Sequence, residues 1–460
     1  MQLLPSHVAQ DIISHGLSFG AEFVDVFIER TQNEGILFKN SRAEDTQSGT
    51  IFGIGIRLIQ GEQALYGYTN STDRDELLRI TTLLGSRIGK KGETSQTINF
   101  EKLTYPKIPV LSDKEVEVKH KLSFLKKIDE KLRLDQKVSQ VMLNFMKKKQ
   151  LIEVYNSDGL YATEERPYIR LFHQLVMKDG NLQSEASHGP GAIGGWEFIE
   201  SLNTNEISEN LIKQATTMLY AAPCPAGKMP VVIDNAFGGV IFHEACGHLL
   251  ETTSVEKKAS VFWDKMGEQI AHGALTAVDD GTIGGAWGSL SIDDEGMPTQ
   301  KTTLIENGIL KRFISDRLGE KKTGHKRTGS ARRQSYKFAP ASRMRNTFIE
   351  RGPYEMEEIL SSVSDGLYAK KMGGGSVDPS TGQFNFAVQE AYLIKNGKIT
   401  TPVKGATLIG TGPEIMSRIS MVGKNLELMA GMCGSVSGSI PTTVGQPPIK
   451  VDEILVGGEA

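Results

Sequence analysis

The sequence predicts an α+β protein, in which a mixed N-terminal α/β domain precedes a mostly antiparallel, β-rich C-terminal domain that carries one important helix. Helix-like and strand-like segments are mixed in the first half, whereas short β-rich runs with glycine turns dominate from Met229 onward. A chain of 460 residues is also too long for a single hydrophobic core. We place the boundary in the proline- and glycine-punctuated stretch Ala221–Gly227, which gives domains 1–221 and 222–460.

Hydrophobic periodicity assigns the elements of the N-terminal domain. The predicted helices are 5–18, Asp73–Ile88 with Ser71 or Thr72 as its N-cap, the lysine-rich amphipathic segment Asp113–Leu134, and Asn205–Tyr220. The predicted strands are Phe23–Glu29, Gly35–Lys39, Gly49–Ile59, Gln63–Thr69, Val138–Asn144, Leu151–Asn156 and Tyr168–Lys178. The third and fourth of these strands form a predicted hairpin about Gln60-Gly61-Glu62.

The C-terminal domain begins with the apolar run Val231–Ile233, which is typical of a strand. Asp234 and Asn235 are helix-capping residue types, and the segment Ala236–Glu251 is then predicted to be one helix. Short strands follow this helix. The clearest predicted hairpins are Thr302–Ile305 with Ile309–Ser315 about Asn307-Gly308, and Ala391–Lys395 with Lys398–Pro402 about Asn396-Gly397.

Composition excludes several functional classes. Hydrophobic residues at 39% and charged residues at 23% are globular values, and a formal net charge of −3 gives no reason to expect nucleic acid or an anionic membrane as a partner. Three cysteines cannot build a disulfide framework, which indicates a reducing compartment. The N-terminus lacks a signal-peptide pattern, and no apolar run reaches the ~18 residues of a membrane span. We therefore expect a soluble, cytoplasmic protein.

The motif that is most informative about function is formed by His243, Glu244 and His248. Two imidazoles beside a carboxylate supply neutral nitrogen ligands for zinc and a base for a metal-activated water. In the common H-E-x-x-H pattern the histidines are four residues apart and face the same side of a helix. Here they are five apart, so a regular helix would turn them ~140° away from each other. We therefore predict that the helix is irregular or ends between Glu244 and His248.

A catalytic zinc usually takes three protein ligands, so a third ligand must lie elsewhere in the chain. Cys246 could share a helix face with His243, but a small buried hydrophobic residue is the favoured interpretation. Cys433 lies in a glycine-flanked segment that permits a tight turn, and its position alone leaves its role as a ligand open. Cys224 is flanked by prolines and is interpreted as structural. No ligand spacing involves the other histidines, which include His173, His188, His272 and His325.

The hexapeptide from His243 to His248 resembles the HExxxH motif of the TldD subfamily of TldD/PmbA metalloproteases. The resemblance extends along nearly the whole chain and is densest from residue 229. It is carried by Gly53–Asn70, Ser291–Gly308, Arg312–Leu318, Thr328–Tyr336, Ala391–Thr411, Gly431–Gly434 and Val444–Pro447. A variable middle section, at about 90–200, is less similar, and Cys246 occupies a position that we expect to be aliphatic in the family.

This resemblance implies that one zinc per chain is bound by His243, His248 and Cys433, with Glu244 as the general base. It further implies a metallopeptidase that hydrolyses peptide bonds in unfolded or leader-type peptides. The family also suggests a dimer, formed either by two copies of this chain or with an inactive family paralogue.

The glycine-lined edge at Gly373, Gly374 and Gly375 could bind such a peptide by strand addition. Two other functions stay open. One is a non-catalytic peptide- or protein-binding modulator with structural zinc, although structural zinc normally has four protein ligands and no adjacent base. The other is a cysteine hydrolase that uses Cys433 as its nucleophile, which would be insensitive to metal chelation.

Overall fold

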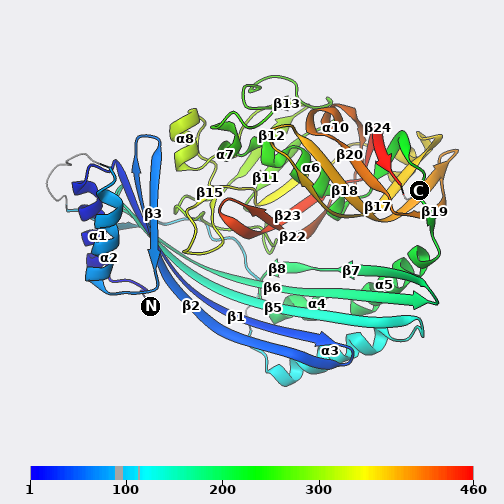
Figure 1. Ribbon diagram of the computed structural model, residues 1–460, viewed down its shortest axis with the longest axis horizontal. Helices are drawn as coiled ribbons and strands as arrows, with labels where there is room; N and C mark the ends of the chain where they lie inside the picture. Colours follow the sequence, from blue (N-terminus) through cyan, green and yellow to red (C-terminus); the bar gives the residue numbers. More distant parts are fainter. Residues whose placement is uncertain (1, 89–96, 112–113, 459–460) are drawn as a thin grey trace.

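The structure is a computed structural model that describes residues 2–88, 97–111 and 114–458. It has the predicted α+β class. In Figure 1 the long strands of the N-terminal part form a curved sheet, and the C-terminal part packs as a second, β-rich body over one face of this sheet. Among the described residues, no helix is both long and apolar enough to cross a membrane.

The N-terminal sheet has the strand order β3-β2-β1-β5-β6-β4, with β7 and β8 also paired to β6. Its long antiparallel strands are β1 (Phe23–Lys39), β2 (Arg42–Gln60), β5 (Val138–Asn156) and β6 (Leu160–Asp179). Its shorter strands are β3 (Gln63–Thr69), β4 (Glu101–Lys102), β7 (Leu182–His188) and β8 (Gly191–Ile193). Of these, β4 runs parallel to β6.

Strands β1 and β5 are each continuous where the periodicity predicted two separate strands. The apolar pattern is interrupted where the side chains are polar but buried and bonded to one another. Thr31 Oγ1 donates a hydrogen bond to Glu29 Oε1 at 2.5 Å, and Gln150 Nε2 donates to the same oxygen at 3.0 Å. Because buried polar groups are normally satisfied in this way, they can occupy interior positions of the sheet and break its apolar pattern.

Helices cover the opposite face and one end of this sheet. They are α1 (Ser6–Ser18), α2 (Arg74–Gly85), α3 (Val118–Leu132), α4 (Trp196–Ser201) and α5 (Thr204–Leu219). The predicted cap of α2 is wrong: Asp73 takes this position rather than Ser71 or Thr72, and its Oδ1 accepts a hydrogen bond from Glu76 N at 2.9 Å. Asp113, the predicted start of the third helix, lies outside the described residues.

The first sheet of the C-terminal part closes on itself. Its ring of paired strands is formed by β10 (Gly227–Ile233), β17 (Asp365–Val377), β18 (Gln383–Lys395), β20 (Thr407–Thr411) and β24 (Ile449–Gly457). A second sheet contains β11 (Ala277–Asp280), β12 (Lys301–Glu306), β13 (Ile309–Leu310), β16 (Asn346–Ile349), β22 (Glu427–Ser435) and β23 (Gly438–Gln446). Most pairs are antiparallel, as predicted, and the parallel pairs include β10 with β17 and β16 with β23.

Both predicted hairpins of the C-terminal part are present, in β12–β13 and in β18–β19, where β19 spans Lys398–Lys404. Their two-residue turns need positive φ angles, which the turn residues adopt: Asn307 (50°), Gly308 (81°), Asn396 (50°) and Gly397 (73°). The first hairpin is shorter than predicted, since β13 ends at Leu310 rather than at Ser315. Ile314 instead forms a β-bridge with Glu251, next to the motif.

The largest hydrophobic core lies in the C-terminal part and holds the segment that carries the motif. Ile241, Phe242 and Ala245 are fully buried in this core. The short helix to which they belong contacts β17 and β18 of the closed ring and also β16 and β23 of the second sheet. The motif is therefore anchored where the two sheets meet.

Candidate metal centre

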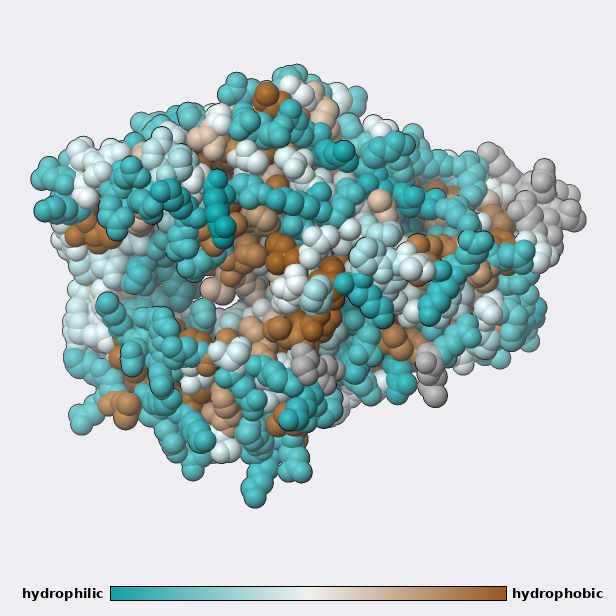
Figure 2. All heavy atoms as spheres, turned by 180° about the vertical axis from the view of Figure 1, so that it is seen from behind, coloured by the Kyte–Doolittle hydropathy of each residue, from teal (hydrophilic) through white to brown (hydrophobic). Residues whose placement is uncertain are grey.

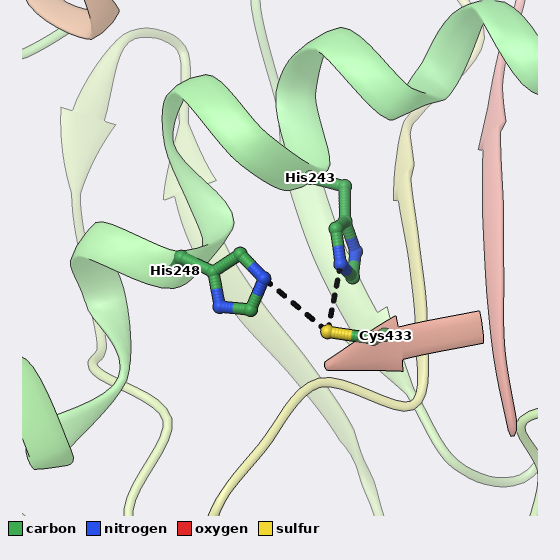
Figure 3. Close-up of side chains that lie close together, drawn as sticks. All are labelled: His243, His248 and Cys433. Carbon is green, nitrogen blue, oxygen red and sulfur yellow. Dashed lines mark hydrogen bonds between the residues drawn. The ribbon is translucent and has the colours of Figure 1, made fainter. Parts of the chain in front are cut away.

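The segment Ala236–Glu251, predicted above as one helix, is divided into shorter pieces. They are a 3-10 helix η1 (Ala236–Gly239), the α-helix α6 (Val240–Ala245) and a second 3-10 helix η2 (Gly247–Leu250). The α-helix ends at Cys246, whose φ of −136° and ψ of −49° leave the helical range. The irregularity predicted between Glu244 and His248 is therefore confirmed (Figure 3).

This break brings His248 back toward His243. Their ring centroids are 4.9 Å apart, whereas a continuous helix would direct the two side chains ~140° apart. Gly247 follows the break directly and is closely packed, because an added Cβ there would lie 2.2 Å from the sulfur of Met344. A residue without a side chain therefore fits at this position without displacing Met344.

The connection from β10 into the motif is held by Asp234, but not as a helix cap. No side chain caps the 3-10 helix that begins after Asn235. Asp234 Oδ1 instead accepts a hydrogen bond from Asn235 N at 2.9 Å, and its Oδ2 accepts one from the Tyr368 hydroxyl on β17. Asn235 therefore occupies the N-cap position without a capping side-chain bond, and the Asp234 carboxylate links the end of β10 to the neighbouring strand β17.

Three potential ligand atoms meet beside this break. His243 Nε2 and His248 Nε2 each lie 3.2 Å from Cys433 Sγ. Cys433 belongs to β22, so a strand from near the end of the sequence brings the thiol to the two imidazoles (Figure 3). The three ligand atoms all lie within 4.8 Å of one another. Arg343 Nη2 donates to the Cys433 carbonyl at 2.6 Å and so holds this part of the strand in place.

The other nitrogen of each imidazole has its own partner. His243 Nδ1 lies 3.1 Å from Thr347 Oγ1, and His248 Nδ1 lies 3.0 Å from Glu251 Oε2. Glu251 is buried, and its second oxygen accepts a hydrogen bond from Met344 N at 3.2 Å. A carboxylate that accepts a hydrogen bond from Nδ1–H leaves Nε2 free to bind a metal. Sequence reasoning missed both partners, and only the acidic residue three positions after His248 gave any signal.

Neighbouring charges outweigh burial at two of these groups. Burial alone would raise the pKa of the Cys433 thiol, but the charges and hydrogen bonds of His243 and His248 bring that pKa well below its usual range. Burial also disfavours the charged form of His248 and would lower its pKa, whereas Glu251 and Cys433 raise that pKa well above 6.5. The thiol is therefore held as a thiolate, which is the form that binds metals.

Glu244 lies beside the three ligand atoms without belonging to the group. Its Oε2 is 3.9 Å from His248 Nε2, and its side chain is 19% exposed. It follows His243 directly in α6, so the same short helix holds a ligand and a carboxylate. This carboxylate is close enough to take a proton from a water or a substrate at the site, and it is not needed as a ligand.

The other cysteines and histidines lie outside this group. Cys246 is fully buried in the hydrophobic core, where burial raises the pKa of its thiol, and Cys224 is also buried. Both positions agree with the structural roles inferred from the sequence. The described histidines outside the motif, which include His173, His188, His272 and His325, do not join the group of three ligand atoms.

The predicted glycine edge, Gly373 to Gly375, lies in β17 at an irregularity in its pairing with β18. On the other side of β17, β10 pairs only with Leu367–Ala369, so β10 leaves the rest of this edge unpaired. An added Cβ at Gly375 would lie 2.1 Å from the Phe386 ring, whereas one at Gly374 would meet nothing within 4 Å. The glycines thus combine a close packing contact with an open stretch of strand.

The chemistry and spacing of the three ligand atoms fit zinc. One thiolate and two imidazoles form a set that catalytic zinc uses, with a fourth position left for water or substrate. Ordinary bond lengths of tetrahedral zinc place a nitrogen and a sulfur ligand about 3.5 Å apart, close to the 3.2 Å between each Nε2 and Sγ here. Magnesium and calcium prefer oxygen ligands, which this group does not supply.

The fold and this centre define a class of protein: an α+β chain that presents a buried His-His-Cys group beside a carboxylate, as metal-dependent hydrolases do. The chain belongs to the PmbA/TldA metallopeptidase family. The model of the family's C-terminal domain matches residues 226–458, that of the central domain matches 112–219, and that of domain 1 matches 24–81.

Similar proteins carry related names. A metalloprotease TldD homolog from Haemophilus influenzae is 35% identical over an alignment that covers 97% of this chain and 95% of the relative. A zinc metalloprotease TldD homolog from Saccharolobus solfataricus is 30% identical, with 66% and 70% covered. The solved structure of TldE from Thermococcus kodakarensis has a TM-score of 0.77 at 19% identity, with 98% and 100% covered. At that identity the structural likeness supports the fold alone.

Proposed function

We propose that this protein is a zinc-dependent peptidase in which Glu244 acts as the general base. The observation that carries the proposal is the buried group of His243, His248 and Cys433, with a partly exposed carboxylate 3.9 Å from one imidazole. Zinc bound by this group would polarise a carbonyl and lower the pKa of a water molecule. Membership of a metallopeptidase family supports the peptide bond as the target.

Each residue of the centre has a separate task in this proposal. The two imidazoles and the thiolate would hold the metal, while the Glu251 carboxylate keeps the His248 ring in its tautomer and orientation. Glu244 accepts a proton from the attacking water and delivers it to the leaving amine. None of these tasks requires Cys246, which is buried in the core.

An extended peptide is the substrate that this fold favours. Beyond Ala369 the edge of β17 that faces β10 is not paired by that strand, so a peptide could add there through backbone hydrogen bonds. Recognition of this kind depends little on sequence and requires an unfolded or flexible chain, which supports unfolded or leader-type peptides as substrates. We extend the proposal to a dimer, of two copies or with an inactive paralogue, which light scattering on purified protein would test.

One observation favours a second candidate function. A thiolate in contact with an imidazole is also the arrangement of a cysteine hydrolase, and Cys433 makes such contacts with both His243 and His248. In that mechanism an imidazole must be free of metal to transfer protons. A modulator with structural zinc is less favoured, because three ligands beside a carboxylate leave a coordination position for chemistry.

The substitution Glu244→Gln tests the proposed peptidase. We expect the variant to fold and to keep zinc, because Glu244 is not one of the ligand atoms. Cleavage of an unfolded peptide should fall on the order of 10²-fold or more, since an amide cannot accept the proton of the attacking water. Zinc content is measured by mass spectrometry of the metal, and cleavage by mass spectrometry of the products.

Chelation provides the control. The parent protein should lose activity when zinc is removed and recover it when zinc is returned. Cleavage that survives complete removal of the metal would favour the cysteine hydrolase. If Glu244→Gln cleaves at the parent rate with zinc bound, the proposed peptidase mechanism is wrong.

A further inference from the structure

A second polar site lies where the N-terminal sheet meets the C-terminal part. Figure 2 shows that the molecule is hollowed between these two parts. A cavity of about 250 Å³ is lined there by β6 and β7 from one side and by η1, β17, β18 and β22 from the other. Its charged or titratable lining residues are Arg170, Lys371 and His188, and no carboxylate among the described residues lines it.

The two cations of this cavity are bonded to neutral oxygens. Arg170 Nη2 donates to the carbonyl of Ala430 at 3.3 Å. Lys371 Nζ donates to the carbonyl of Ser187 and to Gln214 Oε1, the latter at 2.8 Å. Neither cation forms an ion pair with any residue in the described ranges. A partly buried positive charge without an anion is energetically costly. A negatively charged group bound in this cavity would compensate that cost.

The pKa directions of the neighbouring groups agree with an excess of positive charge. Burial, together with nearby positive groups that include both cations, lowers the pKa of His188 to about 4. Burial lowers the pKa of Lys371 to about 8, even though Glu390 acts in the opposite direction. Glu390 does not compensate Lys371 fully because it is ion-paired at 2.8 Å with Lys370. A bound anion would stabilise these charges.

The cavity also lies near the metal centre along a single strand. Ala430, which lines the cavity and accepts the bond from Arg170, is three residues before Cys433 in β22. Three residues of extended chain span about 10 Å. An extended peptide that passes the thiolate would therefore reach the cavity with a residue about three positions from the bond to be cleaved.

We infer that this cavity binds a carboxylate of the peptide substrate, either its C-terminus or an Asp or Glu side chain, about three residues from the scissile bond. The inference rests on the proposed peptidase function for the identity of the ligand. Arg170 and Lys371 donate the charge-assisted hydrogen bonds. The apolar lining, which includes Phe172, Phe237 and Met429, lowers the local polarity and so strengthens them.

Peptide binding tests this inference without requiring cleavage. The zinc-loaded Glu244→Gln protein is titrated into short fluorescein-labelled Ala/Ser/Gly peptides, and fluorescence anisotropy gives each Kd. One pair of peptides differs only in a C-terminal carboxylate or amide, and a second pair only in an internal Glu or Gln. We expect the acidic member of one pair to bind about tenfold more tightly than its neutral partner, as a charged hydrogen bond allows.

Substitutions in the same background locate the effect. Lys371→Met should remove the preference for the acidic peptide, and Lys371→Glu should reverse it. Lys398→Met is the matched control, because it removes an exposed lysine in the β18–β19 hairpin, outside the cavity, and should keep the preference. Arg170→Gln is a second, independent variant that decides the question if the Lys371 variants do not fold by circular dichroism.

The peptide pair that shows the preference identifies whether the bound carboxylate is the C-terminus or a side chain. Either result supports the inference. Equal binding of acidic and neutral peptides would overturn it, as would a full preference that persists in both Lys371→Met and Arg170→Gln. Failure of the parent protein to cleave any peptide would instead contradict the proposed peptidase. The binding comparison would still stand on its own.

Discussion

Two pairs of histidines in this protein have opposite electrostatic surroundings. The rings of His243 and His248 are 4.9 Å apart and face a thiolate, and their outer nitrogens have oxygen partners. The rings of His173 and His188 are 6.4 Å apart, and burial is the main cause that lowers the pKa of each to about 4. Two imidazoles close together are therefore not sufficient for a metal centre. An anionic partner distinguishes the two pairs.

The two histidine pairs also differ in their hydrogen-bond partners, which are anionic only at the metal centre. His248 has a carboxylate on Nδ1 and the Cys433 sulfur on Nε2. His173 Nδ1 donates to the carbonyl of His188 at 3.1 Å, while its buried Nε2 has no hydrogen-bond partner among the described residues. The Glu251 carboxylate and the Cys433 sulfur can therefore stabilise added positive charge on His248, whereas burial keeps His173 and His188 neutral.

Removal of the Cys433 thiolate should have the largest effect, because it changes the metal centre that distinguishes the two histidine pairs. Cys433→Ala leaves two imidazoles without their anionic partner, so we expect the purified variant to contain little zinc. Cys246→Val is the matched control, because it replaces a buried core thiol with a hydrophobic side chain and should keep the metal. Zinc analysis of the two proteins measures the effect. Loss of zinc in Cys246→Val, with retention in Cys433→Ala, would reject the ligand assignment.

A smaller effect is expected from the partner of His248. Glu251→Gln keeps the shape of the side chain but removes the charge that holds the Nδ1 proton, so zinc affinity should fall about 10- to 100-fold. Competition with a chromogenic chelator gives the affinity. Glu244→Gln, a change of the same kind in the same segment, should bind zinc like the parent. An unchanged affinity in Glu251→Gln would mean that this carboxylate has only a structural role.

The sequence predicted the break in the motif helix because five-residue spacing is a local geometric fact. The fold class and most elements also followed from periodicity, except where buried polar groups such as Glu29 and Gln150 interrupt the apolar pattern of a continuous strand. The third ligand was different. Cys433 lies 190 residues from His243, so no local spacing points to it, and family resemblance alone suggested it.

The partners of the site were harder still to predict. Thr347 reaches His243 from a strand of the second sheet, and nothing in its sequence surroundings marks it. The cavity of Arg170 and Lys371 is assembled from strands of the two parts of the molecule, so it exists only after they pack together. Long-range arrangements of this kind depend on the tertiary fold rather than on periodicity.

The smallest expected effect is the pH dependence of stability that comes from His173, one of the two neutral histidines. The pKa of His173 is about 4 in the folded protein and about 6.5 when unfolded, so the unfolded chain binds more protons between these values. The contribution of His173 to stability is therefore complete above pH 6.5 and is lost as the pH falls toward 4. The stability lost through His173 between about pH 7 and pH 5 should amount to about 2 kcal/mol. Urea unfolding of the parent and of His173→Asn at both pH values measures this difference.

Other groups also titrate in this range, so the comparison must be made between the two proteins rather than within one. Burial raises the pKa of Asp293 and of Asp316 to about 7, and these two carboxyl groups titrate in both the parent and the variant. His188, whose pKa is lowered to about 4 by burial and by His173, also titrates in both proteins. The parent should lose more stability on acidification than His173→Asn, whose amide can donate to the His188 carbonyl and does not titrate. Equal losses would mean that His173 is not held neutral by burial, and the contrast between the two histidine pairs would then rest on the thiolate alone.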